Sequence, residues 1–126
     1  MTTTLEKQVT LTAVDFFTAK LQFEATPYGL KNAENPSEYF ILDVRDAESF
    51  AKEHIPGATN VPLVDLTKKL ATLPKDKTIV TYCWHHDCAA APKAALELAQ
   101  RGFKVKDLCG GIKAWKEAGF PVEGTK

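Results

Sequence analysis

Residues 78–118 read TIVTYCWHHDCAAAPKAALELAQRGFKVKDLCGGIKAWKEA, and this stretch decides the fold. Residues 78–82 are β-branched and aromatic, as in a buried strand, and residues 89–101 form an alanine-rich helical pattern. A second strand is predicted at 105–109 and a second helix at 112–118. Strand and helix alternating at such short spacing predict an α/β domain with a parallel sheet covered by helices on both faces.

Each of the two predicted helices is followed by the same dipeptide. Gly102-Phe103 follows the first helix and Gly119-Phe120 the second. Glycine readily takes the left-handed conformation that ends a helix, and the next apolar residue packs back onto it. The repeat supports both helix boundaries.

The first half of the chain carries shorter elements. Thr12, with Asp15 three residues later, predicts a capped helix that runs to about residue 25 and is broken at Pro27 and Gly29. The other expected elements are a strand at 39–43 (YFILD), a short helix capped by Asp46, a turn at Pro56-Gly57, a brief strand at 60–62 and a short helix marked by Leu66 and Leu70.

Length and composition indicate one globular domain. The chain has 126 residues, 44% of them hydrophobic and 25% charged. A domain of this size already buries roughly two-thirds of its unfolded surface, so a second core is not expected.

Charge and hydropathy exclude several classes of partner. Sixteen basic and sixteen acidic residues leave no net charge, so nucleic acid is not expected as a partner. No stretch approaches the run of about 18 apolar residues that a membrane span needs. The polar N-terminus lacks the layout of a secretory signal, so we expect a cytoplasmic location. The oligomeric state is not indicated.

The segment from Cys83 to Ala89 joins a predicted strand directly to a helix. Ligands of open parallel sheets bind beyond the carboxyl ends of the strands, where Cys83 lies. A sharp turn there can aim several backbone N–H groups at one point, and the helix dipole adds positive potential. Such surroundings favour the thiolate, which is the nucleophilic form of cysteine. The alternative is a buried cysteine that only fills space.

Four motifs occur in order along the chain: Asp43-Val44-Arg45, His54-Ile55-Pro56-Gly57-Ala58, Tyr82-Cys83, and 109–115 (CGGIKAW) followed by Gly119-Phe120-Pro121. Together they resemble the successive signatures of rhodanese domains. The resemblance covers about residues 9–122, so residues 1–126 are interpreted as a single rhodanese-like domain.

This resemblance implies a five-stranded parallel sheet and an active-site cysteine that carries sulfane sulfur as a persulfide. Cys83 would take sulfur from a small-molecule or protein persulfide donor and pass it to a thiophilic acceptor, such as a thiol. The thiolate attacks a sulfur–sulfur bond, holds the sulfur covalently and is regenerated by the acceptor. This chemistry requires no metal and no organic cofactor.

The loop departs from the usual family pattern. Family members commonly have an arginine five residues after the cysteine and a serine or similar residue next, where this chain has Cys88 and Ala89. Asp87 adds negative charge, and the two histidines supply positive charge only when protonated. Thiosulfate, an anion, is therefore expected to be a weak donor. The residues expected to cradle the substrate are Trp84, His85, His86, Asp87, Cys88 and Ala89.

Cys88 has three possible functions. It could be a small residue at a helix start, a resolving thiol for Cys83, or a metal ligand. Four ligands within six residues could hardly surround one ion, so a metal set of Cys83, His85, His86 and Cys88 is disfavoured. Cys109 ends the next strand and is expected to border the same pocket, although a cysteine there is more often simply buried.

Three further residues receive structural interpretations. Asp43 and Arg45 could pair near the base of the loop, or only finish a strand, and His54 is expected to close the turn before Pro56. The sequence as a whole predicts a sulfurtransferase with Cys83 as nucleophile. The alternatives are a catalytically silent rhodanese-like module that binds a protein partner, and a redox or metal-sensing domain that uses Cys83 and Cys88.

Overall fold

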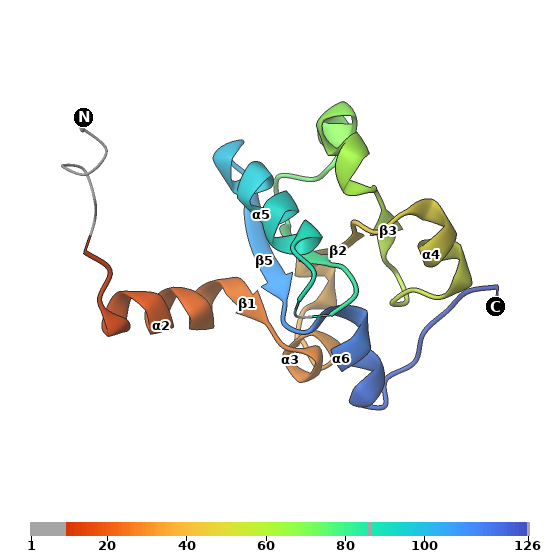
Figure 1. Cartoon of the computed structure of the whole chain (residues 1–126), viewed down its shortest axis with the longest axis horizontal. Helices are drawn as coiled ribbons and strands as arrows, with labels where there is room; N and C mark the ends of the chain where they lie inside the picture. Colours follow the sequence, from red (N-terminus) through yellow and green to blue (C-terminus); the bar gives the residue numbers. More distant parts are fainter. Residues whose placement is uncertain (1–9, 86, 126) are drawn as a thin grey trace.

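Five parallel strands form one sheet in the order β1-β5-β4-β2-β3 (Figure 1). This computed structural model describes residues 10–85 and 87–125. The strands are β1 (Glu24–Ala25), β2 (Tyr39–Asp43), β3 (Thr59–Asn60), β4 (Thr78–Tyr82) and β5 (Lys104–Leu108). The α-helices are α2 (Ala13–Phe23), α3 (Pro27–Lys31), α4 (Ala47–Lys52), α5 (Ala90–Gln100) and α6 (Gly111–Glu117). Two 3-10 helices, η1 (Pro36–Glu38) and η2 (Leu63–Thr72), complete the order.

Strand β4 lies at the centre of the sheet, and its two faces belong to two separate apolar clusters. Ile79 packs with side chains of α5 and η2, including Leu98 and Leu66. Val80 packs on the other face with side chains of α3 and α6, including Trp115. Burial on both faces explains why this strand reads as a nearly continuous apolar run. The predicted parallel sheet with helices on both faces is confirmed.

Most boundaries agree with the sequence pattern to within two residues, and the capping signals are confirmed. Thr12 and Asp15 form a reciprocal capping box at the start of α2, and Asp46 accepts a hydrogen bond from the Ser49 amide at 2.7 Å. Gly102 and Gly119 have φ values of 89° and 86°, as the helix-ending motif requires.

The start of the chain differs from the prediction. Helix α2 ends at Phe23, because Glu24 and Ala25 pair with β5 as an edge strand. Pro27 then begins α3, since proline fits the first turn of a helix, where its missing N–H is not needed. The predicted end of the first helix is confirmed to within two residues, whereas the short helix α3 was not predicted.

Helix α2 extends away from the sheet, to the left in Figure 1. None of its residues is buried, and the side chain of Leu21 is 83% exposed. Within the described residues, no helix has the length and apolar character that a membrane crossing demands.

Candidate active site

Cys83 follows β4 directly and is only 3% exposed. Seven residues link β4 to α5, and the middle of this loop is held by its own hydrogen bonds. The amide of Cys88 donates to the carbonyl oxygen of His85 at 3.1 Å, and the amide of Asp87 donates to Nδ1 of His85 at 3.2 Å. These two amides are therefore used within the loop and do not face Cys83.

The loop brings Cys83 and Cys88 together. The Cys83 thiol donates to the carbonyl oxygen of Cys88, with a sulfur–oxygen distance of 3.6 Å, and the two side chains interact with each other. The backbone amides of Trp84 and Ala91 favour the thiolate form of Cys83, and those of Trp84 and Ala90 favour the thiolate form of Cys88, so they act to lower the pKa of these thiols. The expected cradle of N–H groups therefore comes from the start of the loop and the first turn of α5.

The two thiols differ in acidity. Burial, and next the neighbouring Cys88, raise the pKa of Cys83 to about 12, although the amides of Ala91 and Trp84 act against this. Burial also acts to raise the pKa of Cys88, but the Cys83 thiol and the amides of Ala90 and Trp84 outweigh it, so that pKa is lowered. Cys88, the less buried thiol, ionises first. The sequence-based expectation of a thiolate on Cys83 remains a prediction, and burial of this thiol acts against it.

A cavity of about 30 Å³ adjoins both sulfurs. This volume suits about one water molecule or one atom of similar size. Its walls come from the loop, the start of α5, the end of β5 and the turn before α6, and they comprise Cys83, His85, Cys88, Ala91, Pro92, Asp107, Leu108, Gly110 and Gly111.

Asp107 contributes the carboxyl group of this cavity. It lies on β5 beside Thr81 of β4, whose hydroxyl donates to it at 3.4 Å. Burial raises the pKa of Asp107 to about 6; the hydrogen bond from Thr81 acts to lower it, and the negative charge of Glu24 to raise it. The sequence analysis did not single out Asp107. The available signal was its position two residues before the strand-ending Cys109, which places it at the ligand-binding edge of the sheet.

The first turn of α6 supports the loop from behind. The amides of Ile112 and Lys113 donate to the carbonyl oxygens of Cys83 and Trp84 at 3.0 and 2.9 Å. Gly111 has a φ of 63°, and a Cβ atom there would lie 2.7 Å from the Cys83 carbonyl oxygen. Glycine is therefore required at this close approach of two backbones.

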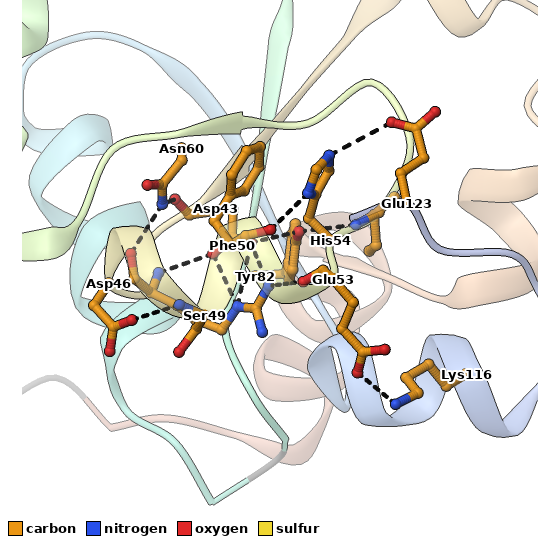
Figure 2. Close-up of polar contacts among 12 residues, drawn as sticks. Asp43, Asp46, Ser49, Phe50, Glu53, His54, Asn60, Tyr82, Lys116 and Glu123 are labelled. Atoms are coloured by element: carbon orange, nitrogen blue, oxygen red, sulfur yellow. Dashed lines mark hydrogen bonds and ion pairs between the residues drawn. The ribbon is translucent and has the colours of Figure 1, made fainter. Parts of the chain in front are cut away.

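A buried ion pair lies at the base of the loop. The Arg45 guanidinium donates to both carboxylate oxygens of Asp43, with a shortest nitrogen–oxygen distance of 2.7 Å. The Tyr82 hydroxyl donates to the same carboxylate at 2.6 Å, and the Asn60 amide donates to the Asp43 carbonyl oxygen (Figure 2). The expected Asp43–Arg45 pairing is confirmed, and it links the ends of β2, β3 and β4.

Arg45 also contacts the loop itself. Its guanidinium carbon lies 4.6 Å from the centre of the Trp84 ring, a cation–π distance. The Nη1 atom of Arg45 is buried and has no hydrogen-bond partner among the described residues. Trp84 remains 44% exposed and borders a groove outside the loop together with His85, Ile112 and Lys113. The structure therefore stacks Trp84 on Arg45, outside the cavity at Cys83.

The other residues proposed from the sequence fall into three groups. His85 and Cys88 line the cavity, whereas Asp87 is exposed and Ala89, also exposed, is the N-cap of α5 without a side-chain cap. His86 lies outside the described residues. Within residues 10–85 and 87–125, no three His, Cys, Asp or Glu side chains are grouped so as to hold a metal ion.

Cys109 does not border this cavity, contrary to the expectation. Its amide donates to the Ala25 carbonyl oxygen of the edge strand at 2.8 Å, and its exposed side chain lines a separate hollow beneath α2. β1 lies next to β5 on the side of the sheet away from β4. Because Cys109 pairs with β1 there, its side chain does not reach Cys83.

His54 has a structural position, as expected. Its Nδ1 lies 2.7 Å from the Phe50 carbonyl oxygen, its ring stacks on that of Phe50, and its Nε2 lies 3.5 Å from Glu123 (Figure 2). It joins the end of α4 to the C-terminal segment.

Comparison with known proteins identifies the family. The sequence model of the rhodanese-like domain matches residues 26–118. The chain belongs to the rhodanese-like family. The crystal structure of the BH2092 protein from Bacillus halodurans has a similar fold, with a TM-score of 0.82 and 38% identity over 90% of this chain and 85% of that one.

Two curated relatives of this rhodanese-like chain have informative names. Thiosulfate sulfurtransferase GlpE of Coxiella burnetii is 35% identical over 60% of this chain and 70% of its own length. The HTH-type transcriptional regulator Rv0324 of Mycobacterium tuberculosis is 41% identical over 68% of this chain, but the match spans only 38% of the regulator. The relatives named sulfurtransferases support a role of that type.

Proposed function

We propose that this chain is a sulfurtransferase whose Cys83 carries sulfane sulfur as a persulfide between a sulfur donor and a thiophilic acceptor. The observation that carries the proposal is the placement of Cys83, which is buried at the carboxyl end of β4 and lines a cavity of about 30 Å³. A cavity of that size has room for one added sulfur atom.

The nucleophile forms by proton transfer within the thiol pair. Cys88 ionises first, so its thiolate accepts the proton of Cys83. The Cys83 thiolate then attacks the outer sulfur of the donor, and the bond between that sulfur and the rest of the donor breaks. The departing donor thiolate takes a proton from water, and Cys88 keeps the proton that it accepted from Cys83.

The persulfide formed on Cys83 carries its charge on the added sulfur. Backbone amides at the start of α5 are positioned to stabilise an anion, because N–H groups and the helix dipole act in the same direction. An acceptor thiol or cyanide attacks the added sulfur, the sulfur–sulfur bond breaks and the Cys83 thiolate is restored.

The charges near the loop disfavour anionic donors. Asp87 is exposed in the loop, and the nearby guanidinium of Arg45 is already paired with Asp43 in a bidentate ion pair. None of the loop residues that the structure describes is a lysine or an arginine. The preferred donor is therefore an organic or protein persulfide with little charge at its terminal sulfur.

The intact mass of the protein after exposure to an organic persulfide donor tests this function. Immediately after mixing, the protein should carry one added sulfur atom at Cys83, and cyanide added at that point should remove it as thiocyanate. Cys109→Ser is the matched control, because Cys109 lies outside the cavity and should leave the uptake unchanged. A Cys83→Ser protein that takes up labile sulfur as well as the parent would refute the assignment.

A further inference from the structure

Three reactive side chains from different elements share the small cavity. Cys83 comes from the end of β4, Cys88 from the loop before α5, and Asp107 from β5. The proposed carrier cycle uses Cys88 only as a proton acceptor and does not use Asp107. Their arrangement supports a second reaction, which rests on the proposed persulfide of Cys83.

We propose that Cys88 resolves the Cys83 persulfide, expelling the bound sulfur as sulfide and leaving a Cys83–Cys88 disulfide, with Asp107 as the proton acceptor for Cys88. The domain would then release sulfide whenever no external acceptor arrives first.

The loop already holds the two cysteines in contact. Their side chains interact, and the Cys83 thiol reaches the backbone carbonyl of Cys88. A disulfide needs Cβ atoms about 3.5–4.5 Å apart. The loop is attached to β4 at one end and to α5 at the other, which keeps the two cysteines close to each other.

The attack of Cys88 on the persulfide balances in electrons. The Cys88 thiolate attacks Sγ of Cys83 and forms a new sulfur–sulfur bond, while the bond from Sγ to the added sulfur breaks. The electron pair leaves with the added sulfur, which takes the proton that Asp107 accepted from Cys88, departs as hydrosulfide and is thereby reduced. The two cysteines are oxidised to a disulfide. A small dithiol reductant, itself oxidised to a cyclic disulfide, returns both cysteines to thiols.

Once Cys83 carries the added sulfur, Cys88 needs a different route for losing its proton. A Cys83 persulfide no longer has a thiol proton to donate to Cys88, and its negative charge disfavours a second anion nearby. Cys88 in the loaded state therefore has to give its proton to a base before it can attack. The Asp107 carboxylate lies on the wall of the same cavity and is the nearest group of that kind on β5.

The surroundings of Asp107 set the range of pH over which it can accept a proton. Burial raises its pKa to about 6. Below that pH Asp107 is protonated and accepts no proton, so the rate of resolution should fall as the pH drops through about 6. The titratable groups that face it are Glu24 on β1, His85 and Cys88 in the loop, and Cys83 at the end of β4.

The experiment gives the reduced full chain one equivalent of an organic persulfide donor and follows sulfide release and intact mass. The parent should release about one sulfide per donor and lose the mass of two hydrogen atoms. Cys88→Ser should instead keep one added sulfur and release at least tenfold less sulfide. Cys109→Ser should behave as the parent.

Asp107→Asn tests the proton acceptor. General base catalysis is worth roughly 10²–10⁴-fold, so this variant should release sulfide at least tenfold more slowly at pH 7.5 and lose the fall in rate below about pH 6. Thr81→Val removes the hydroxyl beside Asp107, keeps the carboxylate and should retain the pH profile, which distinguishes proton acceptance from a packing defect. An Asp107→Asn protein with the parent's rate and profile contradicts the assignment to Asp107.

Two other outcomes separate the proposals. A parent protein that holds the added sulfur as durably as Cys88→Ser overturns the resolving reaction but leaves the carrier function intact. A Cys83→Ser protein that is folded and still takes up labile sulfur as well as the parent counts against the Cys83 carrier and therefore against both.

Discussion

The loop after β4 and the turn after β5 start from similar positions but differ in what they do. Both follow neighbouring parallel strands of the sheet, and both begin with a cysteine. Cys83 is buried beside the cavity, whereas Cys109 is exposed and faces the hollow under α2. The turn after β5 instead presents Gly111 and the amides of Ile112 and Lys113 to the back of the Cys83 loop.

This difference shows that a cysteine at a strand end becomes reactive through its surroundings. The Cys83 sulfur has helix amides, a second thiol and a cavity. Cys109 has a neighbouring edge strand, which uses its amide in sheet-like pairing with Ala25. In the proposed mechanism the loop after β4 carries the chemistry, and the first turn of α6 holds the backbone of that loop.

The largest effect should come from replacing each cysteine in turn. Cys83→Ser should abolish sulfur transfer from an organic persulfide to cyanide, because serine cannot hold the sulfur as a persulfide. Cys109→Ser should change the rate less than twofold. Thiocyanate formation under steady-state conditions measures both, and equal losses in the two variants would contradict the contrast between the two strand ends.

Cys88→Arg should shift donor preference toward thiosulfate. Each charge-assisted hydrogen bond to an anion is worth roughly 1.5–3 kcal/mol, so kcat/KM for thiosulfate should rise about ten- to hundredfold relative to that for an uncharged persulfide donor. The parent should use thiosulfate poorly at neutral pH. A parent already fast with thiosulfate, or a variant that changes both donors equally, would show that another cation serves this site.

Gly111→Ala should disturb the support of the loop. A Cβ atom at this position would lie 2.7 Å from the Cys83 carbonyl oxygen, and overpacking of this kind costs about 1–3 kcal/mol. Gly57→Ala is the matched control, because Gly57 also has a positive φ, of 84°, but has open space around its Cβ position. Its cost should be the strain of about 1–2 kcal/mol alone.

Urea unfolding of both glycine variants measures these costs. Gly111→Ala should lose about 1–3 kcal/mol more stability than Gly57→Ala and should also slow sulfur transfer. Equal destabilisation with unchanged transfer rates would mean that the turn after β5 does not hold the loop.

The two thiols of the loop should differ in their reaction with iodoacetamide. The thiolate is the reactive form, and the pKa is lowered at Cys88 and raised at Cys83. At about pH 7.5, Cys88 should therefore be modified roughly tenfold faster than Cys83. Peptide mapping over time measures the rates, and the same measurement in guanidinium chloride should show nearly equal reaction at both cysteines. Faster modification of Cys83 in the folded protein would reverse the proposed order of ionisation.

Much of the fold could be predicted from local sequence. Local side-chain pattern or φ angle within a few residues determines many of the elements. The elements predicted in this way are the strands at 39–43 and 78–82, the capping residues Thr12 and Asp46, and the glycines that end α5 and α6. The edge strand near the start of the chain was harder to predict. Glu24 and Ala25 become a strand only because β5 is available to pair with them.

The candidate site divides in the same way. Local order along the chain was enough to place Cys83 at the carboxyl end of a parallel strand and to put Cys88 in the same loop, because a strand followed directly by a helix forces that placement. Only the tertiary structure decided the state of these thiols. Their acidity depends on burial and on which amides face each sulfur, and Asp107 and Gly111 reach the loop from a neighbouring strand and turn. Asp107 and Gly111 lie more than twenty positions after Cys83, so no local pattern records their approach to it.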